Sequence, residues 1–193
     1  PPVRVAEEFA MLDVLSGGRF IAGFPLGTSQ DTIFGYGQVP VTLREKYYEA
    51  HDLVIKAWTE REPFSFNGKY TQLRYVNIWP RPYQQPHPPI WVGAHSPASM
   101  EFAAKNNYNV SQNIDVDPVI AEKFEYFRKV WHEFNHSGPM PRTFLMRAVH
   151  VAETDAIARE EAEQHLLVSR SLGRAEIAKT RIGFKGNEDT PTS

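Results

Sequence analysis

Short apolar runs alternate with longer amphipathic segments along most of this chain. Apolar side chains recur at spacings of four and three residues from Leu43 to Ala57 and again from Ile120 to Phe134, which predicts two amphipathic helices. The apolar runs between helices predict buried strands, at residues 19–24, 90–93, 108–113 and 144–151. Because strands and helices alternate, we expect parallel strands and an α/β fold class.

Further helices and one hairpin complete the pattern. The helices are predicted at residues 5–15, 97–106 and 155–172, the first of them ended by Ser16-Gly17-Gly18. The stretch from Phe64 to Tyr70 contains an Asn-Gly pair, which is typical of a β-hairpin turn. Five prolines between Pro80 and Pro89 exclude regular structure there. The polar tail, residues 183–193, is expected to be flexible.

Four core strands are few for a parallel sheet with helices at both ends of the chain. A complete (β/α)8 TIM barrel has eight strands and typically about 250 residues. We therefore expect residues 1–193 to form a single domain that is the middle part of such a barrel. A small doubly wound sheet is the alternative, and the alternation of elements does not separate the two.

Composition excludes several classes of function. The formal net charge is −2, which gives no electrostatic reason to expect a nucleic acid or a membrane surface as partner. The chain has no cysteine, so it has no disulfide and no thiolate metal site, and we expect no metal. No apolar run is long enough to cross a bilayer, and the first residues do not resemble a signal peptide. The expected location is the cytoplasm.

The segment from Ile90 to Ala104 holds the first candidate site. An apolar strand ends at a glycine, Ser96 is placed to cap the following helix, and Pro97 suits its first position. The free N–H groups and the dipole of such a helix attract an anion, and Ser99 could add a second hydroxyl. Taken alone, the segment is explained better by an ordinary capped helix, because serine caps are common.

Three other residues are candidates on local grounds. Gly27 lies in a loop after a strand and would let the backbone approach a ligand, although a turn could equally require the glycine. Arg147 lies within an apolar strand and needs an anion or solvent as its partner. His95 lies at a strand end, where barrel enzymes place their chemistry, and histidine can act as a general base. Asp13 and Arg19 flank the Ser-Gly-Gly turn and suggest a structural pair.

Several segments, taken in order, resemble the bacterial-luciferase-like flavin-dependent monooxygenases. Each segment is a weak signal alone, but the ordered set covers most of the chain and is specific. The segments are Arg4 to Arg19, Tyr48-Glu49-Ala50, Trp58-Thr59-Glu60, the hairpin from Phe64 to Tyr70, Pro80-Arg81-Pro82, Pro88 to Pro97, and Val151-Ala152-Glu153-Thr154.

The resemblance implies a TIM barrel, of which this chain carries helix three to helix seven with a β-hairpin insertion. It implies oxygenation of a small organic substrate by reduced FMN and O2, with a flavin reductase as partner. A related barrel that uses the deazaflavin F420, or a non-catalytic flavin-binding protein, is the alternative. Carried over by position, Ser96 and Ser99 contact the flavin phosphate, with His95 beside them and Gly27 in the strand-four loop. The family's catalytic histidine belongs to a strand that this chain lacks, so the catalytic residues are unknown.

One departure from the family pattern concerns the phosphate. Many members have Arg-Gly in the strand-four loop, and this chain has Leu26-Gly27. A hydrogen bond to a charged group contributes about 1.5–3 kcal/mol, so its loss would weaken FMN binding by roughly one to two decades. We therefore expect loosely bound FMN unless another basic residue compensates. If the chain stands alone, a homodimer is expected to cover the open edges of the sheet.

Overall fold

The structure is a computed structural model of the chain and describes residues 1–27, 30–113, 115, 117–147 and 149–164, with only the backbone described for residues 30–32. It divides into two compact units, Pro1–Met146 and Arg147–Ser193. In the second unit residues 155–164 are helical, which confirms the predicted helix start. The end of that helix and the tail at 183–193 lie outside the described residues. Of the helices that are described, none is long and apolar enough to cross a membrane.

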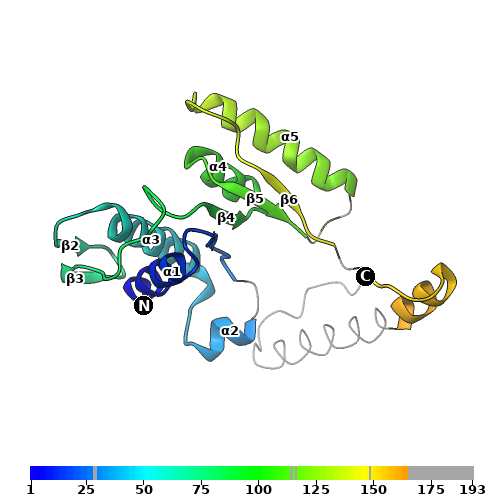
Figure 1. Ribbon diagram of the computed structural model, residues 1–193, viewed down its shortest axis with the longest axis horizontal. Coiled ribbons are helices and arrows are strands. Elements are labelled where there is room, and N and C mark those ends of the chain that lie inside the picture. The colour runs from blue at the N-terminus through cyan, green and yellow to red at the C-terminus, as the bar shows by residue number, and fades with distance from the viewer. Residues whose placement is uncertain (28–29, 114, 116, 148, 165–193) are drawn as a thin grey trace. The chain divides into compact units, whose positions relative to one another are not determined.

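The first unit alternates strands and helices as predicted (Figure 1). A hairpin is inserted between α3 and β4, and it forms a separate two-stranded antiparallel sheet. The elements, in chain order, are α1 (Pro2–Leu15), β1 (Ala22–Gly23), α2 (Gln30–Gly35), α3 (Pro40–Thr59), β2 (Phe64–Asn67), β3 (Gln72–Val76), β4 (Ile90–Gly93), α4 (Pro97–Lys105), β5 (Asn109–Gln112), α5 (Asp117–Glu133) and β6 (Thr143–Leu145).

The sheet topology separates the two predicted architectures. The four core strands pair in the order β1-β4-β5-β6, and every pair is parallel. Each strand thus lies beside the core strand that precedes it in the chain, as in a barrel. A doubly wound sheet would contain a point where the strand order reverses. The described sheet is therefore an arc of a TIM barrel, and the prediction of a partial barrel is confirmed.

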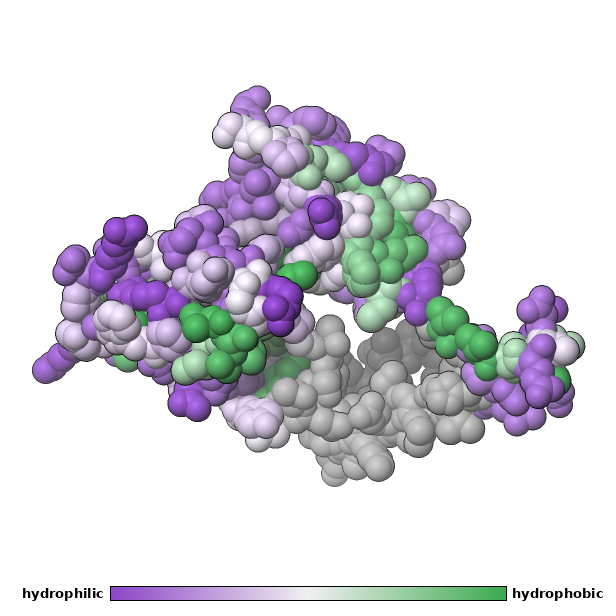
Figure 2. Space-filling model, in the orientation of Figure 1, coloured by the Kyte–Doolittle hydropathy of each residue, from purple (hydrophilic) through white to green (hydrophobic). Residues whose placement is uncertain are grey.

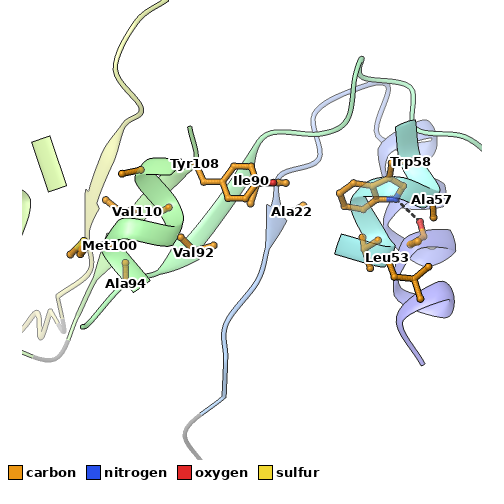
Figure 3. Packing of buried hydrophobic residues seen from close by; sticks show 14 of the residues in the cluster. Ala22, Leu53, Ala57, Trp58, Ile90, Val92, Ala94, Met100, Tyr108 and Val110 are labelled. Carbon is orange, nitrogen blue, oxygen red and sulfur yellow. Dashed lines mark hydrogen bonds between the residues drawn. The ribbon is translucent and has the colours of Figure 1, made fainter. Parts of the chain in front are cut away.

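The two faces of the sheet differ in what they contact. Val92 and Val110 are buried together with Met100 of α4, on the face that the helices cover (Figure 3). Side chains alternate along a strand, so Trp91 and Gly93 point to the opposite face. In a closed barrel, that concave face lines the interior.

Helix α1 packs on α3 at one end of the arc. Small side chains, Ala6 and Ala10, are fully buried and let the helices approach closely. The Trp58 indole N–H donates a hydrogen bond to the Ala6 carbonyl at 2.9 Å, shown by the dashed line in Figure 3. A buried indole needs such an acceptor.

The predicted pairing of Asp13 with Arg19 is wrong. Asp13 is fully buried and accepts hydrogen bonds from the backbone N–H and the side-chain amide of Gln84, at 2.8 and 2.7 Å. The same amide donates to the Phe20 carbonyl at 2.8 Å. These contacts join the end of α1 to the segments that lead into β1 and β4.

Three strands are shorter than predicted, and β5 is so by only one residue at each end. β1 covers only Ala22–Gly23, the two residues that pair with β4, and Phe20 before it packs its ring against Phe9 of α1, with the ring centroids 5.0 Å apart. β6 ends at Leu145, because its neighbour β5 ends at Gln112, and the bond from Met146 N–H to the Gln112 carbonyl closes the ladder. Arg147 lies beyond β6, so the strand alternation used to orient its side chain does not apply.

Apolar side chains are exposed on both sides of the arc. Figure 2 shows hydrophobic surface gathered over α1 and over β5 and β6. Exposed residues there include Leu12 and Leu15 of α1, and Phe144, Leu145 and Met146 at β6. In a closed barrel the neighbouring strands and helices cover such surfaces.

Candidate functional site

A cavity of about 550 Å³ opens at the carboxyl ends of the core strands. Its volume falls within the roughly 300–1,000 Å³ that small-molecule sites occupy. In barrels this edge of the sheet carries the ligand. The lining residues are Gly23, Phe24, Pro25, Leu26, Gly27, Arg44, Tyr47, Tyr48, Trp91, Val92, Gly93, His95, Ser96, Ser99, Phe102, Ser111, Gln112, Asn113, Phe144 and Met146. The structure thus brings four of the predicted site residues, Gly27, His95, Ser96 and Ser99, to one cavity.

The N-terminus of α4 forms a reciprocal capping box at the cavity wall. The Ser99 N–H donates to the Ser96 hydroxyl at 3.4 Å, and the Ser96 N–H donates to the Ser99 hydroxyl at 2.9 Å. The Ser99 hydroxyl in turn donates to the Ser96 carbonyl at 2.8 Å. Pro97 has no N–H, so the Ala98 N–H is the remaining donor of the first turn. This donor, the Ser96 hydroxyl and the helix dipole suit an anion.

His95 is fixed in orientation by its neighbours. Gln112 is fully buried, and its amide N–H donates to the Ala94 carbonyl, so its oxygen faces the His95 ring. That oxygen lies 3.1 Å from Nδ1 of His95. In the neutral ring the proton is therefore on Nδ1, and Nε2 is left as a hydrogen-bond acceptor. Lys123 holds the His95 carbonyl at 2.9 Å and pairs with Asp115 at 2.6 Å.

The loop after β1 forms another wall. Gly27 has a φ of +83°, and a Cβ there would meet no atom within 4 Å, so backbone strain alone requires the glycine. The Tyr47 hydroxyl of α3 donates to the Phe24 carbonyl at 2.9 Å and anchors the loop. Burial raises the pKa of the Tyr47 hydroxyl to about 12, so this donor keeps its proton at physiological pH.

Aromatic rings line the rest of the cavity. Trp91 and Phe144 make an edge-to-face contact, with their ring centroids 5.6 Å apart. Tyr48 and Phe102 lie 4.8 Å apart and join α3 to α4. These walls give planar apolar surface suited to an aromatic ring system. Arg44 also lines the cavity, and sequence reasoning did not single it out, because an exposed helical arginine carries no local signal.

The remaining predicted site residue is Arg147. It is the first residue of the second unit, and the structure does not place that unit relative to the cavity. Over the described part of the chain, no three His, Asp or Glu side chains gather in an arrangement that could hold a metal ion.

Solved structures share this fold. Monooxygenase RslO1 from Streptomyces bottropensis superimposes with a TM-score of 0.80 at 24% identity, over 93% of this chain and 55% of that one. The oxygenating constituent of 3,6-diketocamphane monooxygenase from Pseudomonas putida, solved with FMN, gives 0.70 at 21% identity, over 83% and 48%. An F420-dependent secondary alcohol dehydrogenase gives 0.64 at 16% identity, over 75% and 44%. At these identities the likeness shows the fold.

Curated relatives match by sequence. The protein y4wF of Sinorhizobium fredii is 36% identical over 110 residues, which are 57% of this chain and 32% of that protein. The oxygenase component of the flavin-dependent trigonelline monooxygenase of Acinetobacter baylyi is 28% identical over 174 residues, 84% of this chain and 46% of that protein. The chain thus spans less than half the length of these two relatives. The luciferase-like monooxygenase family matches residues 1–191, and the chain belongs to that family.

Proposed function

We propose that this chain forms the cofactor-binding part of a flavin-dependent monooxygenase that uses reduced FMN and O2 to oxygenate a small organic substrate. The observation that carries the proposal is the capped N-terminus of α4, which opens on an aromatic-lined cavity at the carboxyl ends of the strands. An ordinary capped helix would need no such cavity beside it.

The residues present fit the flavin. The Ser96 hydroxyl and the Ala98 N–H suit the phosphate, and Ser99 holds the cap in shape and lies within reach of the same anion. Gly27 gives the loop after β1 its left-handed turn at the cavity wall, where the loop would lie against the cofactor. Nε2 of His95 would accept a hydrogen bond from a ligand hydroxyl or ring N–H. When bound, reduced FMN supplies the electrons that activate O2, and these residues orient it and exclude water.

A sequence relative named as flavin-dependent, and a solved structure of the same fold that contains FMN, support FMN as cofactor. One relative is named as the oxygenase component of a flavin-dependent system, so we propose a flavin reductase as partner. F420 is the second candidate, because a dehydrogenase of the same fold uses it. A homodimer remains our expectation for the assembly, and Arg147 remains a proposed contact to substrate or flavin. A nitrogen-containing aromatic acid such as trigonelline is the first substrate class to test.

Isotope incorporation tests the reaction. The full-length protein is mixed with enzymatically reduced FMN, labelled O2 and trigonelline or its analogues, and the products are analysed by mass spectrometry. We expect one labelled oxygen atom per product molecule, and no product when FMN is omitted. Binding of F420 in preference to FMN, with hydride transfer and no labelled product, would replace the proposal with the F420 alternative. Flavin binding without turnover of any substrate would favour a non-catalytic role.

A further inference from the structure

His95 presents its Nε2 nitrogen to the cavity. Its Nδ1 lies 3.1 Å from the side-chain oxygen of Gln112, and no group in the described part of the chain forms a hydrogen bond with Nε2. A Cβ added to Gly93 would lie 3.6 Å from Nε2. Gly93 points to the concave face of the sheet, so Nε2 lies over that face, where His95 lines the cavity.

The partners of His95 fix its ring without placing a negative charge beside it. Gln112 accepts from Nδ1 through a neutral amide oxygen, whereas a carboxylate in that position would favour a second proton on the ring. Lys123, paired with Asp115, holds the backbone carbonyl of His95 and not the ring. In the neutral ring Nε2 therefore keeps a lone pair, which can accept a hydrogen bond or a proton.

No other described residue of the cavity wall can take up a proton near neutral pH. The described lining residues include no aspartate, glutamate or lysine. Arginine, as at Arg44, already carries its proton throughout the physiological range, and tyrosine hydroxyls are protonated near neutral pH. Histidine is the side chain that most often accepts protons in this range. His95 is therefore the one proton acceptor among the described lining residues.

We propose that the cavity takes a planar aromatic substrate with an ionisable hydroxyl group, and that Nε2 of His95 accepts the hydroxyl proton. This inference rests on the proposed function. Trp91 and Phe144, in edge-to-face contact with their ring centroids 5.6 Å apart, line the same cavity and offer apolar surface to the substrate ring. The substrate O–H bond breaks, an N–H bond forms at Nε2, and the electron pair stays on oxygen. The resulting phenolate is more electron-rich than the phenol, so reduced FMN and O2 oxygenate it more readily.

Binding of 4-nitrophenol tests this role, because its ionised form is yellow and its methyl ether, 4-nitroanisole, has no proton to give. Both compounds are titrated into the full-length protein below the pH at which free 4-nitrophenol ionises. The wild type should bind 4-nitrophenol as the phenolate, about 10- to 100-fold more tightly than 4-nitroanisole. NMR of protein with labelled histidine should show a proton added at Nε2 of His95.

Two variants separate the two ring nitrogens. His95→Asn keeps an N–H near the position of Nδ1 for Gln112 and lacks Nε2, so the preference for 4-nitrophenol and the yellow bound form should both disappear. His95→Gln places an amide oxygen near the position of Nε2, so it should recover part of the affinity without ionising the ligand. His132→Gln is the matched control, since His132 is an exposed histidine on α5 that does not line the cavity. Circular dichroism and thermal unfolding confirm that each variant is folded.

The outcomes separate the inference from the proposed function. If the wild type binds FMN but leaves bound 4-nitrophenol protonated, or binds it no better than 4-nitroanisole, the assignment of His95 is wrong and the flavin assignment stands. A fall in FMN affinity in His95→Asn with 4-nitrophenol binding unchanged would also overturn it, because Nε2 would then serve the flavin. Turnover of trigonelline, which has no hydroxyl, at a rate unaffected by His95→Asn would contradict the substrate class. If the wild type does not bind FMN, the proposed function fails, even where 4-nitrophenol ionises on His95.

Discussion

Replacing the buried Asp13 with alanine should destabilise the fold while leaving the cofactor site intact. Asp13 lies at the amino ends of the strands, before β1, and its partner Gln84 lies before β4. The cavity lies at the carboxyl ends. In barrels the amino-terminal edge serves stability and the carboxyl-terminal edge serves function, so the two effects should be separable.

The contacts set the size of the effect. Asp13 accepts two hydrogen bonds from Gln84, at 2.8 and 2.7 Å, and its side chain is fully buried. Each hydrogen bond to a charged group contributes about 1.5–3 kcal/mol, which makes the gross loss about 3–6 kcal/mol. Removing a carboxylate from the negative end of the α1 dipole removes an unfavourable interaction and offsets about 1–2 kcal/mol of this loss. We therefore expect the free energy of unfolding to fall by about 2–4 kcal/mol.

Urea unfolding followed by tryptophan fluorescence measures this loss. A double-mutant cycle with Asp13→Ala, Gln84→Ala and the double variant isolates the coupling between the two side chains. FMN affinity, measured without denaturant where every variant is folded, should stay within about twofold of the wild type, a margin of about 0.4 kcal/mol. A loss of stability below about 1 kcal/mol, or strictly additive single variants, would refute the reasoning.

Two further predictions concern buried polar groups. Gln112→Leu removes the oxygen that faces Nδ1 of His95 and leaves the Ala94 carbonyl without its side-chain donor. The free energy of unfolding should therefore fall by about 1–3 kcal/mol, and flavin affinity should drop. Unchanged chemical shifts of His95 by NMR would contradict this prediction. Burial lowers the pKa of His51 below its ordinary value of 6.5, more than Asp52 beside it raises that pKa. The unfolded chain therefore takes up a proton as pH falls below about 6.5, and stability that is complete above that pH is lost as pH falls towards the lowered pKa. Urea unfolding across this range should show the slope, His51→Gln should flatten it, and an unchanged slope in that variant would disprove the assignment.

Elements with strong local signals were predictable. The serine at position 96 and the proline after it mark the start of α4, and the structure begins the helix at Pro97. The run at 90–93 matches β4, because both its ends are fixed by turn residues. The four-three spacing of apolar residues identifies α3 and α5, because it marks one apolar face of a helix.

Features that depend on distant contacts were not predictable. The hairpin was expected to turn at Asn67-Gly68, but Asn67 pairs with Gln72, so the connection is longer. The carboxylate of Glu49 on α3 sets this turn by accepting the N–H groups of Tyr70 and Thr71. Helix α2 was missed because its six residues are too few to show a helical period.

The candidate site likewise contains some residues that the sequence predicts and one that depends on a distant contact. Ser96, Ser99 and His95 follow one strand and carry a local signal, so the sequence suffices to group them. Arg44 lies 52 positions before Ser96, and it lines the same cavity because α3 packs on α4 through contacts such as those of Tyr48 and His51 with Phe102. Sequence spacing alone carries no information on that contact.

A crystal structure of the full-length protein with FMN tests the central claim most directly. The account predicts the phosphate at the N-terminus of α4, with its oxygens about 2.7–3.2 Å from the Ser96 hydroxyl and the Ala98 N–H. It also predicts the flavin ring against the aromatic walls of the cavity. A phosphate bound at any other place, with the capping box of Ser96 and Ser99 facing solvent alone, would contradict the account.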